Sequence, residues 1–315
     1  MAEISISDKT PRIVEIDSLK RRPNYGETII QTFLFLCGVL SILITIAIVI
    51  ILIYQASLFF MEPEVNLVQF FTSTSWQPII GEFGILPLVS ATLMTTFIAM
   101  AIALPLGMMV AIYLSEYASA RSRNILKPTL ELLAGIPTVV YGYFALTFIT
   151  PMLRDIFGEN RVNIYNTASA GLAMGILILP LISTMTEDAL SAVPRSLREA
   201  AYGLGATKLE VAVKIVLPAA LSGIAAAVLI GLSRAIGETM IVAIAAGATP
   251  QLTASPFKPA ETMTGYIVRI SGGDLSYDSM DYESIYAIAL VLFVITLGLN
   301  LISQRIVHRY YLKYE

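Results

Sequence analysis

Long apolar segments without charged residues follow one another along most of the chain. Five such segments, 21 to 34 residues long, lie at 28–61, 83–115, 132–153, 162–186 and 284–304. About 20 apolar residues let a helix cross the hydrocarbon core of a bilayer, so each segment is long enough to span a membrane. The strands of an outer-membrane barrel would instead alternate apolar and polar residues over ~10-residue segments. The pattern therefore predicts an all-α, polytopic membrane helix bundle.

A sixth span is predicted between residues 215 and 257, where only Arg234 and Glu238 are charged. We expect this helix to begin near Pro218, because proline is tolerated in a first turn, where its missing N–H has no intrahelical partner. The six predicted transmembrane helices are 30–55, 86–113, 130–150, 168–186, 219–246 and 284–305.

Polar tails are predicted at both ends, over residues 1–28 and 306–315. The first transmembrane helix lies within 29–60. Its apolar segment is too long for the hydrophobic region of a signal peptide, and no small-residue cleavage site follows a shorter one. We therefore expect an uncleaved membrane helix.

The basic residues are distributed unevenly over the predicted topology. Of the 20 Lys and Arg residues, 15 fall on the side of the two tails and four on the other side, while Arg234 lies within a span. Cytoplasmic loops of membrane proteins are enriched in Lys and Arg. Both termini and the loop 187–217 are therefore expected in the cytoplasm, and the loop 250–283 is expected to face outward.

Trp76 is the only tryptophan and falls in the first outward loop, near Phe70 and Phe71. Two interpretations are open. The loop contains an interfacial helix that aromatic side chains anchor in the headgroup region, or it lies on the outer surface of the protein itself.

Composition excludes several classes of protein. Hydrophobic residues make up 56% of the chain and charged residues 14%, against about 25% in soluble domains, so a soluble protein is excluded. A net charge of -3 without a basic block argues against a nucleic-acid partner. One cysteine, Cys37, and one histidine, His308, cannot form a disulfide framework or a histidine-based metal site. The chain has no GxxxxGK[ST] phosphate loop, so any nucleotide is bound by another polypeptide.

The loop 187–217 has the pattern of two short helices joined by a tight corner. A first helix begins near Pro194, and Gly205 supplies a left-handed stop. Thr207 and Glu210 have the spacing of a capping box, which begins the second helix. A solvated hairpin that only links two spans explains this pattern equally well, whereas a DNA-reading helix-turn-helix would lie on a soluble basic domain.

The same loop resembles a family signature. Glu199-Ala200-Ala201, Gly205 and Ile215-x-Leu217-Pro218 match the EAA-x3-G-x9-I-x-LP signature of the permease subunits of bacterial ABC importers. The resemblance implies a type I ABC importer permease core over residues 85–305. In that family this loop couples the permease to an ATPase, so the resemblance implies contacts to the ATPase from Arg198, Glu199, Ala200, Ala201, Gly205, Ala206, Thr207 and Leu209.

The resemblance also implies partners and a location. It predicts a second permease subunit, two ATPase subunits that hold ATP and Mg²⁺, and a binding protein on the outer face of a bacterial cytoplasmic membrane. Two further segments, Glu131–Gly142 and Ser233–Met240, are similar to motifs of phosphate importer permeases, which implies inorganic phosphate as the substrate. The alternatives are an importer of another oxyanion, sulfate or molybdate, and an ATP-independent secondary transporter or channel.

Arg234 and Glu238 are the charged residues placed within a predicted span. Arg234 lies about 15 residues, or roughly 22 Å, into this span. Glu238 follows at the i,i+4 spacing that lets side chains meet on a helix. A charge at this depth is costly and should face the bundle interior or a water-filled path. We interpret the two residues as part of an anion path; the alternative is a structural Arg–Glu pair that never meets the substrate.

Overall fold

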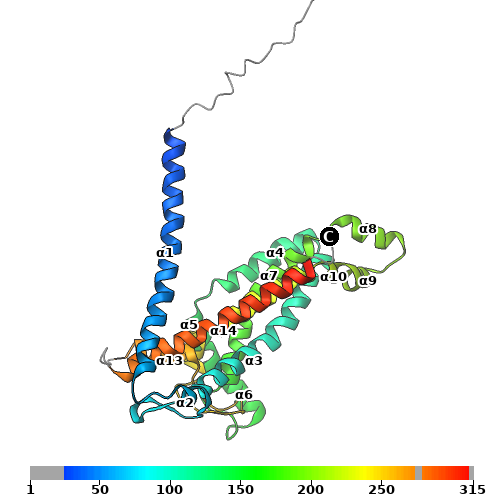
Figure 1. The fold of residues 1–315 in the computed structure, drawn as a ribbon. Coiled ribbons are helices and arrows are strands. Elements are labelled where there is room, and N and C mark those ends of the chain that lie inside the picture. The colour runs from blue at the N-terminus through cyan, green and yellow to red at the C-terminus, as the bar shows by residue number, and fades with distance from the viewer. Residues whose placement is uncertain (1–24, 274–278, 312–315) are drawn as a thin grey trace, which may run out of the picture. The chain divides into compact units, whose positions relative to one another are not determined.

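The structure is a computed structural model that describes residues 25–273 and 279–311, except for the side chains of Ile79 and of 306–311. The chain divides into two compact units, Met1–Ile51 and Leu52–Glu315. The described part of the first unit belongs to helix α1 (Tyr25–Met61), an almost wholly apolar helix whose side chains are mostly exposed within this chain (Figure 1).

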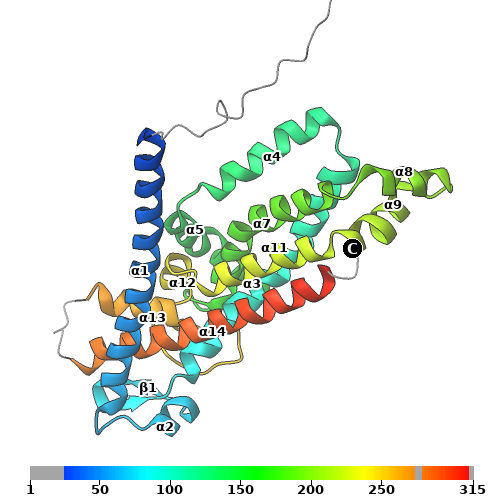
Figure 2. The ribbon, with the colours of Figure 1, turned by 45° about the horizontal axis from the view of Figure 1, so that its top comes forward.

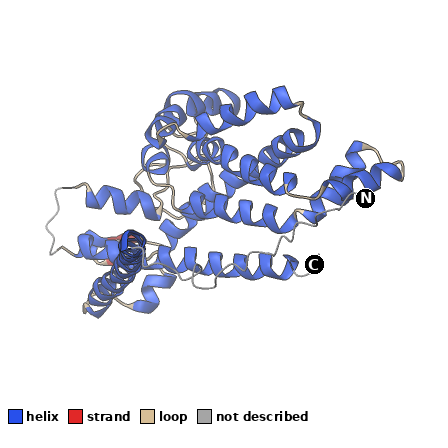
Figure 3. Cartoon of the chain, turned by 90° about the horizontal axis from the view of Figure 1, so that it is seen from above, coloured by secondary structure: helices blue, strands red, loops and turns tan. Residues whose placement is uncertain are grey.

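Four helices form the centre of the second unit. The most extensive helix–helix interface is between α3 (Leu86–Ile112) and α7 (Thr167–Ser191). Helix α11 (Leu221–Ile236) packs on α7 and on α14 (Met280–Tyr311) (Figures 1 and 2). Glycines bring α3 and α7 together, because a Cβ built at Gly171 would lie 2.7 Å from the Cβ of Ile98. The all-α prediction is confirmed, apart from one two-stranded hairpin (Figure 3).

The third predicted span is not a continuous helix. It consists of α4 (Ala120–Ala134), α5 (Thr138–Phe144), the π-turn η4 (Ala145–Ile149) and α6 (Thr150–Phe157), with an 86° bend between α4 and α5. The prediction of one helix over 130–150 was therefore wrong. Pro137 disfavours helical geometry at the preceding Ile136 and caps α5 instead.

The fifth predicted span is broken twice. A helix begins at α9 (Lys208–Val211), continues through the π-turn η5 (Ala212–Val216) and ends in α10 (Leu217–Ala219), 73° from α11. Pro218 therefore lies at the end of one helix and not at the start of the next, which corrects the predicted start. α11 ends at Ile236, and α12 (Met240–Ala245) follows as a separate helix. Within the described residues, four helices are long and apolar enough to span a membrane, or six if each of the two bent pairs forms one span.

An aromatic cluster surrounds the Leu86 end of α3. Side chains come from α1, from α2 (Leu67–Thr72) and from α13 (Met263–Ser271). Strands β1 (Trp76–Gln77) and β2 (Glu82–Phe83) also contribute, and the short 3-10 helix η2 (Pro78–Ile80) connects these two strands. Trp76 is only 1% exposed and lies at ring-centroid distances of 5.3 Å from Tyr266, 6.1 Å from Phe83 and 6.2 Å from Phe70. Trp76 therefore belongs to a packed core within the chain, while the two predicted placements of its loop stay predictions.

At its other end, α3 continues into the π-turn η3 (Tyr113–Tyr117) and meets the connection between α7 and α11. This connection contains α8 (Arg195–Gly203) and α9, which we call the α8–α9 hairpin (195–211). It protrudes beyond the ends of the central helices in Figures 1 and 2.

Candidate functional site

The α8–α9 hairpin has the local structure that its sequence predicts. Pro194 precedes α8, and Gly205 adopts the left-handed region with φ of 85°. Nothing lies within 4 Å of a Cβ built at Gly205, so only the backbone conformation favours glycine there. Thr207 and Glu210 form the predicted capping box at the start of α9. Local sequence signals thus specify this corner without help from distant contacts.

One face of the hairpin is buried and another is exposed. Ala201 and Ala206 pack against a small core that includes Leu190 and Val211. The tip points away from this core, and Leu204 there is 90% exposed. Leu197, Leu209 and Tyr202 are also exposed, and so are the signature residues Glu199, Ala200 and Gly205 and the capping residue Thr207. Contiguous exposed apolar side chains indicate an interaction surface.

Arg198 does not belong to that exposed surface. Its side chain is only 15% exposed, and its Nη2 donates to Oε1 of Glu116 at 3.0 Å and to the carbonyl oxygen of Leu190 at 2.8 Å. Nη1 donates to the carbonyl oxygen of Val193 at 2.5 Å. The guanidinium therefore fixes α8 to the ends of α3 and α7, and the structure turns it inward, away from the surface at which the resemblance placed it.

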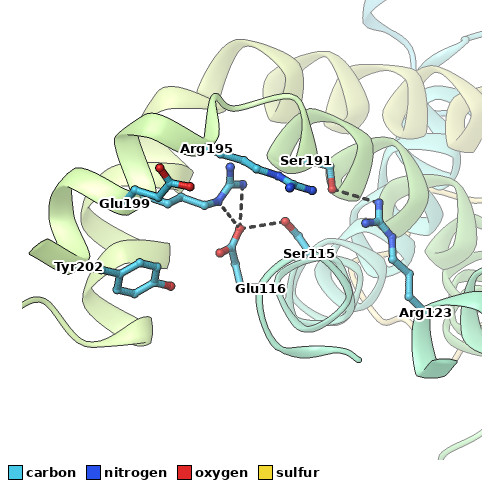
Figure 4. Close-up of a pocket in the computed structure, with 8 residues that line it drawn as sticks. Ser115, Glu116, Arg123, Ser191, Arg195, Glu199 and Tyr202 are labelled. Atoms are coloured by element: carbon cyan, nitrogen blue, oxygen red, sulfur yellow. Dashed lines mark hydrogen bonds and ion pairs between the residues drawn. The ribbon is translucent and has the colours of Figure 1, made fainter. Parts of the chain in front are cut away.

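A cavity of about 320 Å³ lies between part of the hairpin and the helix ends (Figure 4). Glu199 and Tyr202 line it from α8, opposite Ser115 on η3 and Arg123 on α4, and Arg195 reaches into it from the start of α8. Its walls come from both the hairpin and the central helices, so a movement of α8 would change its shape.

Acidic residues at the ends of helices hold this region together. Glu187 of α7 is fully buried and pairs with Arg123 and, at 2.7 Å, with Lys127, both on α4. Sequence reasoning missed Glu116 and Glu187 as candidates. A signal for both was present, because each is the first charged residue after a long charge-free segment. A carboxylate that ends such a segment lies where a helix leaves the apolar layer, within reach of basic loop residues.

The predicted pair of Arg234 and Glu238 does not form. α11 ends at Ile236, so Glu238 lies in the break before α12 and not one turn further along the same helix. Its Oε1 accepts hydrogen bonds from the backbone N–H groups of Met240 at 3.1 Å and Ile241 at 3.3 Å. The side chain is 9% exposed and caps the start of α12. The i,i+4 prediction was wrong because Gly237 ends the helix.

Arg234 therefore has no ion pair with Glu238. It lies in the last turn of α11, 13 residues from Leu221, which corresponds to roughly 20 Å along the helix. Its side chain is exposed, and among the described residues it has no hydrogen bond or ion pair. The neighbouring Ser233 donates to Oδ1 of Asn300 at 3.2 Å and so ties α11 to α14. The structure therefore presents an unpaired guanidinium on an otherwise apolar helix.

The described residues contain no group of three or more His, Cys, Asp or Glu side chains that could hold a metal ion. Basic and apolar side chains carry the chemistry of both candidate regions. Arg234 suits the binding of an anion, and the hairpin tip suits the docking of another protein.

Comparisons with known proteins identify the family. The family model of the binding-protein-dependent transport system inner membrane component matches residues 103–311. The chain is 33% identical to the probable ABC transporter permease protein YqgH of Bacillus subtilis, over 82% of this chain and 84% of that protein. It is 34% identical to the phosphate transport system permease protein PstC of Xylella fastidiosa, over 75% and 78% of the two chains.

A solved structure has the same fold. A chain in the crystal structure of a bacterial alginate ABC transporter, in complex with its alginate-bound periplasmic protein, superposes with a TM-score of 0.62 over 89% of this chain and 97% of that chain, at 19% identity. The chain belongs to the family of inner membrane components of binding-protein-dependent transport systems, as a multi-pass permease subunit with the type I ABC importer fold.

Proposed function

We propose that this chain is the permease subunit of an ATP-driven importer of inorganic phosphate. The observation that carries the proposal is the unpaired guanidinium of Arg234 on an apolar span. A charge at this depth is costly unless it faces the bundle interior or a water-filled path. A guanidinium offers paired donors that fit a tetrahedral oxyanion, and no carboxylate of this chain competes for it among the described residues.

Glu238 has a different role in this proposal. Because its carboxylate caps α12, it fixes the break between α11 and α12 and thereby the position of Arg234 at the end of α11. Arg234 is the residue that meets the anion, and Glu238 is a positioning residue. The name of the relative PstC supports phosphate as that anion.

The partners follow from the two exposed features. The apolar tip of the hairpin docks an ATPase subunit that binds ATP and Mg²⁺, and this chain itself binds no cofactor. A second permease subunit completes the path beside Arg234, and a second ATPase subunit docks on it. A phosphate-binding protein delivers the anion at the end of the molecule that carries the aromatic cluster.

The orientation proposed for the chain places both termini and the hairpin in the cytoplasm, as the distribution of Lys and Arg favours. In a Cys37→Ser background, a membrane-impermeant thiol reagent should label Ala254→Cys in intact cells and leave Ser196→Cys unlabelled. The reverse labelling would refute this orientation.

Uptake of radiolabelled phosphate tests the function. The complete complex is reconstituted in proteoliposomes with ATP inside and the binding protein outside, and uptake is measured with and without excess sulfate or molybdate. We expect ATP-dependent uptake that neither anion suppresses. Suppression by sulfate or molybdate would assign the chain to another oxyanion, and uptake without ATP would identify a secondary transporter or channel.

A further inference from the structure

Two consecutive residues of η3, the π-turn that follows α3, contact the α8–α9 hairpin. Oε1 of Glu116 accepts from Nη2 of Arg198 at 3.0 Å and from its Nε at 3.3 Å, which fixes α8. The Nζ of Lys208, the first residue of α9, lies 5.7 Å from the ring centroid of Tyr117. Each helix of the hairpin is thus attached to the same short segment, η3.

The attachment through Glu116 is the stronger one. Its side chain is 6% exposed, and that of Arg198 is 15% exposed. Separating a buried ion pair leaves two desolvated charges without partners and is strongly unfavourable, whereas an exposed pair contributes little. The pair of Lys214 and Glu210 is such an exposed pair, with side chains 70% and 45% exposed. A movement of α8 will therefore carry Glu116 with it.

The segment that carries Glu116 is the π-turn Tyr113–Tyr117, in which the N–H of Ala118 donates to the carbonyl oxygen of Tyr113. A π-turn interrupts the regular pattern of α-helical hydrogen bonds and is frequent at functional sites. Ser115 also donates to Oε1 of Glu116, at 2.9 Å. The carboxylate thus joins the hairpin to a part of α3 whose backbone differs from that of the helix it ends.

A tightly packed side chain of α7 joins α3 to the helix of Arg234. Ile182 of α7 lies between two glycines: a Cβ built at Gly107 of α3 would be 2.9 Å from its Cγ2, and one built at Gly231 of α11 would be 3.0 Å from its Cδ1. Gly231 precedes Arg234 by three residues, or less than one helical turn. Because protein interiors are close-packed, a shift of α3 at this point displaces Ile182 toward α11.

We propose that Glu116 receives the motion of the α8–α9 hairpin and transmits it through α3 to the helix that carries Arg234. Glu116 is then a positioning residue for transport and touches neither the anion nor the nucleotide. The inference rests on the proposed function, because it requires an ATPase that moves the hairpin.

The test compares Glu116→Gln with the wild type in the complete reconstituted complex. The amide keeps the shape of the side chain and removes its charge. Three quantities are measured: the amount of ATPase subunit that co-purifies, the rate of ATP hydrolysis, and the phosphate transported per ATP hydrolysed. Glu159→Gln makes the same chemical change at a side chain that is 78% exposed and far along the chain from the hairpin, and serves as the matched control.

We expect Glu116→Gln to keep its ATPase subunits and to hydrolyse ATP, while the phosphate transported per ATP falls about tenfold or more, the loss that corresponds to one charged hydrogen bond. Glu159→Gln should leave all three quantities unchanged. An unchanged ratio in Glu116→Gln would overturn the inference, and so would loss of the ATPase subunits, since Glu116 would then only hold the hairpin in place.

Glu116→Asp is the second variant, for the case that Glu116→Gln does not accumulate. It keeps the charge and shortens the side chain by one methylene group, which weakens the bond to Arg198. A lower ratio in an assembled Glu116→Asp complex supports the inference, and a wild-type ratio overturns it. Failure of the wild-type complex to take up phosphate would instead refute the proposed function, so the two failures are distinguishable.

Discussion

At the Leu86 end of α3, aromatic rings close a core around Trp76, which is 1% exposed, whereas at the Tyr117 end the hairpin leaves Leu204 90% exposed. The aromatic cluster is built from buried side chains of several helices and of a strand hairpin of this chain. The α8–α9 hairpin buries one face on this chain and leaves the other exposed. One end of α3 is therefore surrounded by a packed core, and the other carries an exposed apolar surface, which suits the docking proposed above.

Trp76→Ala should have the largest effect on stability. Removing a buried tryptophan from a packed core costs about 3–5 kcal/mol. We expect a clear decrease of the unfolding temperature in detergent, and Trp76→Phe should lose less because it keeps a ring against Tyr266. An unfolding temperature of Trp76→Ala equal to that of the wild type would show that the aromatic cluster is not a core.

Leu204→Ala should have the opposite pattern to Trp76→Ala: it should weaken binding of the ATPase subunit and leave the stability of the chain almost unchanged. An exposed side chain contributes little to folding, so the free energy of unfolding should change by less than about 0.5 kcal/mol. Burial of a leucine against the ATPase is worth about 1.5–3 kcal/mol, so the affinity for this subunit should fall roughly tenfold or more. Binding of the purified ATPase subunit measures this effect. Unchanged binding would remove Leu204 from the docking surface.

Gly205→Val should disturb the hairpin through its backbone alone. The φ of 85° is unfavourable for a β-branched residue, and holding it costs about 1–3 kcal/mol. The corner between α8 and α9 should change shape, with weaker ATPase binding and lower uptake. Gly205→Asn is the control, because asparagine tolerates the left-handed region better. If Gly205→Val binds the ATPase and transports as the wild type does, the corner is not needed for coupling.

The smallest expected effect is on the pH dependence of stability and involves Glu261, which lies before α13. Burial raises the pKa of Glu261 above its ordinary value of 4.5, although Arg269 donates to its carboxylate at 2.6 Å and 3.1 Å. The folded protein therefore binds this proton more tightly than the unfolded chain does. Its contribution to stability is fully present below pH 4.5 and is lost as the pH rises through the folded-state pKa.

Glu261→Gln removes this titration. We expect the unfolding temperature of the variant, relative to that of the wild type, to increase by a small amount as the pH rises from about 4.5 toward neutrality. A difference between the two proteins that is independent of pH would contradict the raised pKa of Glu261.

The sequence predicted the features that depend on neighbouring residues. The capping box of Thr207 and Glu210, the left-handed Gly205 and four of the six apolar spans follow from local signals, and the structure has them. The breaks at Pro137 and Gly237 were missed, since proline and glycine also occur within membrane helices when neighbours satisfy the freed backbone groups. Only the packing decides which of these residues ends a helix.

The partners of charged side chains were the least predictable part of the site. Arg234 and Glu238 have the spacing of a helical pair, but a helix end between them separates their roles. Arg198 was expected at the ATPase surface and instead binds Glu116, which lies 82 positions earlier in the chain. Such long-range pairs depend on how the helices are arranged, and this arrangement cannot be read from the spacing within one segment.

Phosphate uptake by Arg234→Gln and Glu238→Gln, compared at equal assembly in the reconstituted complex, tests the central claim most directly. Glutamine at 238 keeps a carbonyl oxygen that can accept from the N–H groups of Met240 and Ile241, so Glu238→Gln should retain most of the uptake. Arg234→Gln should lose uptake roughly tenfold or more, because the anion loses a charged hydrogen-bond donor. Wild-type uptake by a well-assembled Arg234→Gln complex would contradict the account.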